Sequence, residues 1–261
     1  MIYMATDESK ARLSAPAPGA PEWIYRSAGR FLLLLSLYAP IEVLSQVRTE
    51  VSLADLVEQA GSPRVFYAEP ERRDSLIALL AENGAARIQD LLCLLDTPWA
   101  IHFEVVRRAL ETIDDPARQI VIRELSQNGD THHASLLLAV FEKLGQPGDE
   151  GNLNRYLNSN QRSLIIPAAR CLAEFGRLEQ SSRLLAPLLA DSSAHVRLAA
   201  VWALGKIFMR DSGTRPNPEM IDRIRYLLDD PYPQVRFTAV ETLKILGVMG
   251  EEVPNLLKHA R

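Results

Sequence analysis

Two stretches in the C-terminal part of the chain have closely similar sequences. Residues 191–204 read DSSAHVRLAAVWAL and residues 230–243 read DPYPQVRFTAVETL, and they align without a gap at a shift of 39. The alignment pairs Asp191 with Asp230, Val196 with Val235, Arg197 with Arg236, Ala200 with Ala239 and Leu204 with Leu243. Apolar residues at spacings of about four form the buried stripe of a helix. Because a lone helical hairpin cannot bury both of its faces, the self-match predicts stacked hairpins.

Turn signals extend this period through most of the chain. Second helices are expected to start after turns at Pro98, Asp130, Asn160, Ser193 and Pro233, which are 32, 30, 33 and 40 residues apart. A period of about 30 to 45 residues with two helices per unit is typical of a helical solenoid. The longest interval contains residues 211–218 (DSGTRPNP), which we interpret as an inserted loop. The predicted fold class is therefore all-α, an α-α superhelix of about five hairpins.

The N-terminal part of the chain does not match this repeat. We expect residues 1–21, rich in Ala and Pro, to be a flexible tail, residues 22–71 to be an N-terminal helical cap, and residues 72–261 to be the solenoid. Within the cap, Ser52 is predicted to open a short helix with a capping interaction. The stretch from Gly61 to Pro70 is predicted to be an extended link.

Composition narrows the class of partner and the compartment. The chain has 29 Lys and Arg against 33 Asp and Glu, so its balance argues against nucleic acid as the main partner. The apolar run from Phe31 to Tyr38 is far shorter than the ~20 residues that cross a bilayer, so no membrane association is expected. Cys93 and Cys171 lack metal-binding spacing and are predicted to be buried thiols of a cytoplasmic protein.

The repeated pattern, an Asp followed by Val-Arg and then Ala and Leu, resembles the HEAT repeat family, and especially its short bacterial form of the phycobilisome lyase type. The resemblance is specific in the two C-terminal copies and weaker upstream. There, residues 165–172 (IIPAARCL) have no Arg at the position equivalent to Arg197. In that family, the turn Asp and the helix Arg form a hydrogen-bonded ladder between stacked units. The resemblance implies that Asp191, Arg197, Asp230 and Arg236 form such a structural ladder here.

No catalytic or metal-binding motif is present in the sequence. It contains no GxGxxG, GxxxxGK[ST], GxSxG or HExxH pattern. His132 and His133 lie together at a predicted turn without a third ligand, and we interpret them as solvated turn residues, as we do His102 and His195. We therefore expect a protein that is not an enzyme and uses no cofactor or metal.

A candidate partner surface lies on the predicted second helices, which line the concave face of a solenoid. Trp202, Lys206 and Arg210 share one helix face at spacings of four, and Trp and Arg are common binding anchors. Trp202 packing between repeats is the alternative interpretation. Arg170 on the preceding helix and Glu241 and Lys244 on the next are predicted to extend this partner-binding surface. Trp99, Trp23, Tyr25 and Phe31 are instead expected to be packing residues.

Three functions fit this reading. The first is a scaffold or adaptor that binds a protein partner on the concave face. The second follows from the resemblance: a bilin lyase-like or bilin-binding protein, with Arg170, Trp202 and Lys206 around the tetrapyrrole. The third is a nucleic-acid-binding module of HEAT type, which the acidic balance disfavours.

Overall fold

The computed structural model describes residues 52–127, 129–211 and 217–248. The predicted tail and most of the predicted cap, including Trp23, Tyr25 and Phe31, lie outside these residues. In its described part the chain is all-α, with no strand. No helix of that part is long and apolar enough to cross a membrane.

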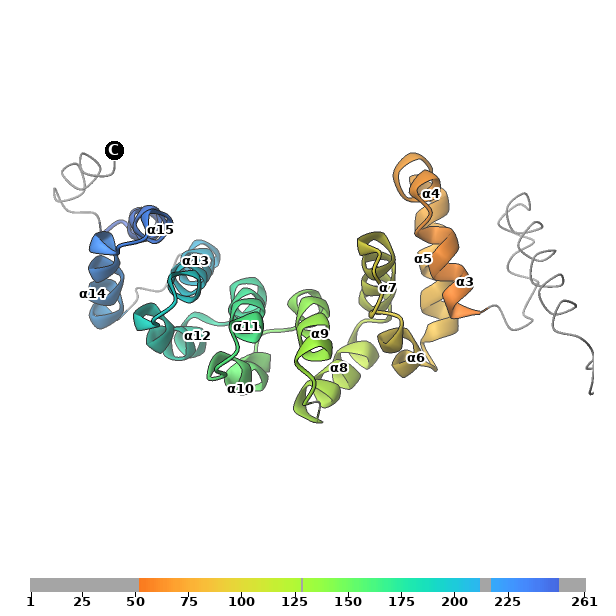
Figure 1. Ribbon diagram of the computed structural model, residues 1–261, viewed down its shortest axis with the longest axis horizontal. Coiled ribbons are helices and arrows are strands. Elements are labelled where there is room, and N and C mark those ends of the chain that lie inside the picture. The colour runs from red at the N-terminus through yellow and green to blue at the C-terminus, as the bar shows by residue number, and fades with distance from the viewer. Residues whose placement is uncertain (1–51, 128, 212–216, 249–261) are drawn as a thin grey trace, which may run out of the picture. The chain divides into compact units, whose positions relative to one another are not determined.

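Within the described residues, three helices precede the repeats: α3 (Leu53–Ala60), α4 (Pro63–Ala68) and α5 (Pro70–Gly84). Five hairpins follow within the described residues, each with a first helix, a turn and a second helix (Figure 1). The first helices are α6 (Ile88–Cys93), α8 (Asp115–Gln127), α10 (Asn154–Leu157), α12 (Leu178–Leu185) and α14 (Pro218–Tyr226). The short 3₁₀ segments η1 (Asp149–Leu153), η2 (Ala186–Ala190) and η3 (Leu227–Asp229) extend three of them. The second helices are α7 (Ala100–Ile113), α9 (Thr131–Leu144), α11 (Arg162–Phe175), α13 (Ala194–Arg210) and α15 (Pro233–Ile245).

The predicted starts of the second helices are confirmed, because each lies within two residues of the observed one. The chemistry of the turns explains this agreement. Asp130 Oδ1 accepts from the amide of His132 at 3.0 Å and so caps α9. Pro233 occupies the first position of α15, where the missing amide proton has no cost.

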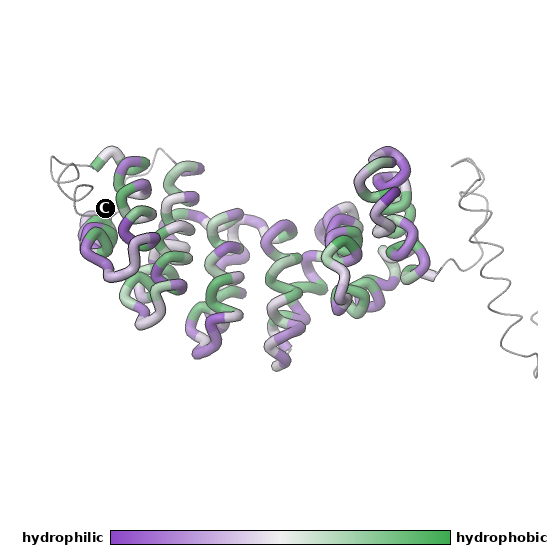
Figure 2. Tube along the Cα trace, turned by 45° about the horizontal axis from the view of Figure 1, so that its top comes forward, coloured by the Kyte–Doolittle hydropathy of each residue, from purple (hydrophilic) through white to green (hydrophobic). Residues whose placement is uncertain are grey.

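The second helices pack side by side in one row, here called the second-helix row. The first helices lie together along one side of this row (Figure 1). Each helix carries both hydrophobic and hydrophilic positions (Figure 2), as expected when one stripe faces a neighbour and another faces water. Small residues set the helix spacing. A Cβ on Gly205 of α13 would lie 2.9 Å from Thr242 Oγ1 of α15, so glycine permits the close approach of these two helices.

The stretch from Gly61 to Pro70 is helical rather than extended, which corrects the predicted link. Ser62 Oγ accepts from the amide of Val65 at 3.4 Å, and Pro63 stands at the first helical position, so these residues start α4. Helix α3 begins after Ser52 as expected, although the Ser52 side chain makes no capping hydrogen bond. The predicted boundary between residues 71 and 72 falls in the first turn of α5.

Two further packing predictions are wrong. Cys93 is exposed, because Ile88, Leu91 and Leu92 take up the buried side of the short helix α6. Trp99 is 65% exposed at the start of α7 instead of packed.

Cys171 is buried as predicted. Its Sγ lies 3.3 Å from the carbonyl oxygen of Leu138 on α9, which it reaches as a donor. Burial raises the pKa of this thiol well above its ordinary value, so Cys171 is an inert core residue.

Phe141 of α9 provides a test of the stacked core. It is fully buried, and its ring meets that of Phe175 on α11 edge-on at a centroid distance of 5.3 Å. Phe141→Ala should lower the free energy of unfolding by about 3–5 kcal/mol, as measured by urea denaturation, because it leaves a cavity between two repeats. Tyr226→Ala, which removes an exposed ring of α14, should change it by less than about 0.5 kcal/mol.

Candidate functional site

One inter-repeat contact defines how the last two described hairpins are joined. The guanidinium of Arg197 on α13 donates to both carboxylate oxygens of Asp230, from Nε to Oδ2 at 2.6 Å and from Nη2 to Oδ1 at 2.9 Å. Its Nη1 donates to the carbonyl oxygen of Asp191 at 2.8 Å, in its own turn. Arg197 therefore ties its own turn to the turn of the next unit.

Of the four residues predicted to form a ladder, Arg197 and Asp230 make the contact between units. Asp191 and Asp230 each close a turn by accepting from the amide two residues later, at 2.7 and 2.8 Å, while Ser193 and Tyr232 are the residues that precede the helices. Arg236 donates to the carbonyl oxygen of Asp230, not to its carboxylate. Arg197–Asp230 is the one carboxylate rung among these four residues.

The electrostatics of this rung favour the charged carboxylate. The hydrogen bond from Arg197 lowers the pKa of Asp230, burial opposes that change, and the Tyr232 amide and the nearby charges of Arg197 and Arg236 lower it further. The side chain of Asp230 is almost fully buried and that of Arg197 is largely so. Such a bidentate pair stabilises one stacking geometry.

Trp202 and Lys206 are both exposed on α13, and their side chains lie together. Trp202 is 36% exposed, so it does not pack wholly between repeats. Lys206 Nζ is 5.9 Å from the centre of the Trp202 ring, within range of a cation-π contact. Among the residues that the structure describes, Lys206 has no carboxylate partner.

Exposed apolar residues that the sequence reading missed adjoin this pair. Gly205 lies one turn of α13 from Trp202 and one turn from Met209. A Cβ on Gly205 would lie 3.8 Å from Ile245 Cδ1 of α15, so Ile245 is close to this part of α13. Met209 is exposed at 60% and Ile245 at 41%. We call Trp202, Lys206, Met209 and Ile245 the tryptophan patch. The sequence alone could not place Ile245 beside Trp202, because the two residues are 43 positions apart and meet only through the packing of α15 next to Gly205.

Arg210 does not extend the tryptophan patch. Its Nη1 donates to the carbonyl oxygens of Ala173 and Glu174 at 2.6 and 2.5 Å, and its Nη2 donates to that of Gly176. A cation is favourable at the carbonyl end of a helix. This predicted binding residue therefore closes the end of α11.

The other predicted binding residues, Arg170, Glu241 and Lys244, are exposed or half-buried and are engaged in ion pairs. Arg170 Nη2 lies 3.0 Å from Glu142 Oε1 of α9, and Lys244 Nζ lies 2.6 Å from Glu241 Oε1 on the same helix. A partner would have to compete with these carboxylates. Trp202 and Lys206 are thus the predicted binding residues that make no ion pair within the described residues.

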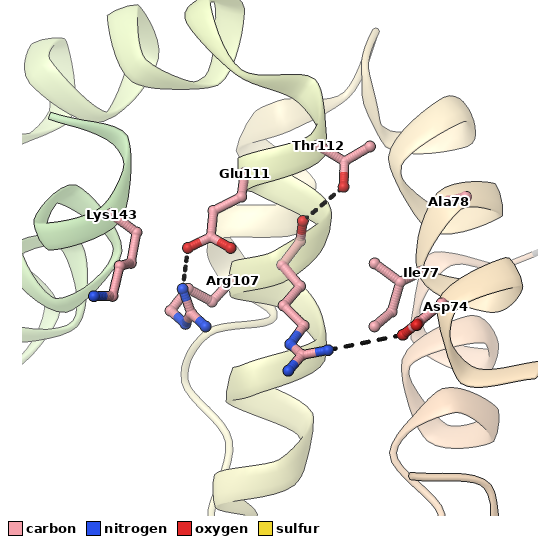
Figure 3. A pocket seen from close by; sticks show the side chains of 8 residues that line it. Asp74, Ile77, Ala78, Arg107, Glu111, Thr112 and Lys143 are labelled. Atoms are coloured by element: carbon pink, nitrogen blue, oxygen red, sulfur yellow. Dashed lines mark hydrogen bonds and ion pairs between the residues drawn. The ribbon is translucent and has the colours of Figure 1, made fainter. Parts of the chain in front are cut away.

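A hollow of about 560 Å³ lies between α5, α7 and α9 (Figure 3). It is lined by Asp74, Ile77, Ala78, Arg107, Arg108, Glu111, Thr112 and Lys143. Arg107 pairs with Glu104 at 2.7 Å and with Glu111, while Arg108 pairs with Glu104 at 2.9 Å and reaches Asp74 at 3.7 Å. These i,i+3 and i,i+4 pairs on α7 were readable from the sequence, although the hollow was not.

The remaining cation of the hollow is also paired. Lys143 Nζ lies 3.7 Å from Glu174 on α11 and 4.0 Å from Glu142. Partial burial raises the pKa of Glu104, but its hydrogen bonds to Arg107 and Arg108 outweigh burial and lower it overall. Because carboxylates already balance its cations, the hollow does not favour anions.

The family comparison agrees with this geometry. The sequence model of the HEAT repeat matches residues 183–208, which run from the end of α12 through α13 and include Arg197. Residues 183–208 therefore carry a HEAT repeat, and the five described hairpins share its all-α, two-helix pattern. No curated protein matches its sequence.

Designed proteins are among the solved structures with a similar fold. An engineered protein of the Northeast Structural Genomics Consortium is 18% identical, with 79% of this chain and 96% of that chain covered and a TM-score of 0.44. A designed armadillo repeat protein in complex with peptide (KR)4 is 20% identical, with 75% and 100% covered and a TM-score of 0.40.

The histidines of the described residues were predicted to be turn residues, but each lies in the first turn of a second helix: His102 in α7, His132 and His133 in α9, and His195 in α13. His132 Nε2 lies 3.2 Å from Asp96 Oδ1, and both side chains are largely exposed. His195 lies beside the ring of Tyr232, with 5.8 Å between ring centres. Within residues 52–248, as far as they are described, no group of three or more side chains could hold a metal ion.

Asp230→Asn should lower the free energy of unfolding of the protein by about 2 kcal/mol at neutral pH, because it replaces a charge-assisted pair. The folded pKa of Asp230 is depressed, so the rung's contribution is present above the ordinary aspartate pKa of ~3.9 and is lost as the pH falls through the lowered value. Urea denaturation at several pH values should show the two proteins converging below that range.

Asp222→Asn is the matched control for this measurement. Asp222 pairs with Arg225 at 3.1 Å on the exposed side of α14. Its loss should cost less than about 0.5 kcal/mol. An equal loss in both variants would contradict the special role of Asp230.

Proposed function

We propose that this protein is a non-catalytic scaffold that binds a protein partner on its second-helix row, the predicted concave face. The tryptophan patch carries the proposal, because it combines an exposed indole with a cation that has no carboxylate partner among the described residues. Tryptophan is enriched among residues that dominate binding energy at protein interfaces. The rest of the row is largely ion-paired and offers less to a partner.

The patch favours a segment with an apolar side chain next to a carboxylate. The apolar side chain would cover Trp202, Met209 and Ile245, and the carboxylate would meet Lys206. Desolvation of the lysine by the partner strengthens its attraction to both the indole and the carboxylate. This chemistry matches a protein segment better than a polyanion.

The two alternative functions receive less support. A bilin needs cations for two propionates, but Arg170 is already bound to Glu142, which leaves Lys206. A nucleic acid needs a basic surface, whereas the arginines of the hollow are matched by Glu104, Glu111 and Asp74. Visible absorbance on mixing with a bilin, or binding of DNA that weakens steeply with salt, would favour one of these over a protein partner.

Trp202→Ala tests the proposal. The full chain and this variant serve as baits in parallel affinity captures, and recovered proteins are quantified by mass spectrometry. A partner that uses the patch should be recovered at least tenfold less by the variant, because removing a central tryptophan costs about 2 kcal/mol or more.

Trp99→Ala is the matched control bait, because Trp99 is also an exposed tryptophan but lies in the turn before α7. It should retain the partner, and circular dichroism should show both variants folded. Equal recovery of every captured protein by the two variants would contradict a binding role for the patch.

A further inference from the structure

Arg236 repeats the geometry of Arg197 within its own turn. Arg197 Nη1 donates to the carbonyl oxygens of Asp191 and Ser192 at 2.8 and 3.2 Å. Arg236 Nη1 donates to those of Asp230 and Pro231 at the same two distances. The two guanidinium groups are therefore held in equivalent positions, one repeat apart.

The two guanidinium groups differ in the partners of their other edge, which is formed by Nε and Nη2. Nε and Nη2 of Arg197 bind the carboxylate of Asp230 in the following unit. In the part of the chain that the structure describes, Nε and Nη2 of Arg236 have no partner. Arg197 shows which group this edge binds: a carboxylate, through two parallel hydrogen bonds.

No helix among the described residues packs on the side of α15 around Arg236. Phe237 is 62% exposed, whereas Leu198, the aligned residue of α13, is half-buried. Lys244 is exposed, whereas its aligned residue Gly205 is buried against α15. We call Arg236, Phe237 and Lys244 the outer side of α15.

The same hairpin also carries one unmatched carboxylate. Its other acidic side chains are paired: Glu219 with Arg223, Asp222 with Arg225, Asp230 with Arg197 and Glu241 with Lys244. Asp229 is exposed, lies next to the turn carbonyls that Arg236 binds, and has no ion pair within the described residues. The hairpin thus presents one open guanidinium edge and one open carboxylate close together.

We propose that a second copy of this chain binds the outer side of α15 across a two-fold axis, with Arg236 of each copy bound to Asp229 of the other. A two-fold axis satisfies both open charges at once, because each copy supplies one donor and one acceptor. The exposed ring of Phe237, next to Arg236 in sequence, is then covered at the interface. This surface is distinct from the tryptophan patch, so either proposal can fail without the other.

Light scattering coupled to size-exclusion chromatography measures the mass of the full chain over a range of concentrations. The wild-type chain should form a dimer. Arg236→Glu and Asp229→Arg should each weaken dimerisation at least tenfold, because like charges then meet across the axis. The double variant, with both charges reversed, should restore the dimer.

Arg225→Glu provides the matched control, because Arg225 is an exposed arginine of the same hairpin that already pairs with Asp222. It should leave the dimer unchanged. A wild-type chain that stays monomeric at every concentration, or a dimer that persists in Arg236→Glu, would overturn the proposal. A monomer that Arg236→Glu destabilises would also overturn it and would place the missing carboxylate in the same chain.

Discussion

The stacking of one second helix on the next is the constraint on which the rest of the structure depends. A hairpin of this kind has apolar surface on both sides, so its stability comes from its neighbours. Close approach requires small residues at the contact, as Gly205 against Thr242 shows, and it makes Phe141 and Phe175 part of one core although they belong to different units. The Arg197–Asp230 pair then selects one register for that contact.

Stacking also decides which side chains remain available for binding. It covers the two lateral sides of a second helix that has a neighbour on each side, as α13 has, and leaves a third stripe facing water, which is where Trp202 and Lys206 lie. The last described helix lacks a described neighbour on one lateral side, so Arg236 and Phe237 there show what stacking covers elsewhere. The two proposed surfaces therefore have separate physical origins.

The starts of the second helices could be predicted because Pro and Asp act locally, through backbone geometry and turn hydrogen bonds. Contacts between units could not be predicted in the same way. Arg210 has the composition of a binding residue, but the carbonyl oxygens that it binds lie 34 to 37 residues away. Likewise the carboxylate that binds Arg197 belongs to the next unit, 33 residues on. The exposure of Cys93 depended on which side of a six-residue helix met its neighbours.

Charge along the second-helix row explains why the tryptophan patch lies where it does. Glu111, Lys143, Glu174 and Lys206 follow one another at intervals of 32, 31 and 32 residues, so acid and base alternate from unit to unit. Such alternation lets adjacent helices neutralise each other, as the contact of 3.7 Å between Lys143 and Glu174 shows. The next residue in this series, 39 positions after Lys206, is Ile245 instead of a carboxylate. The alternation ends there, so on its α15 side Lys206 meets the apolar Ile245 instead of a carboxylate.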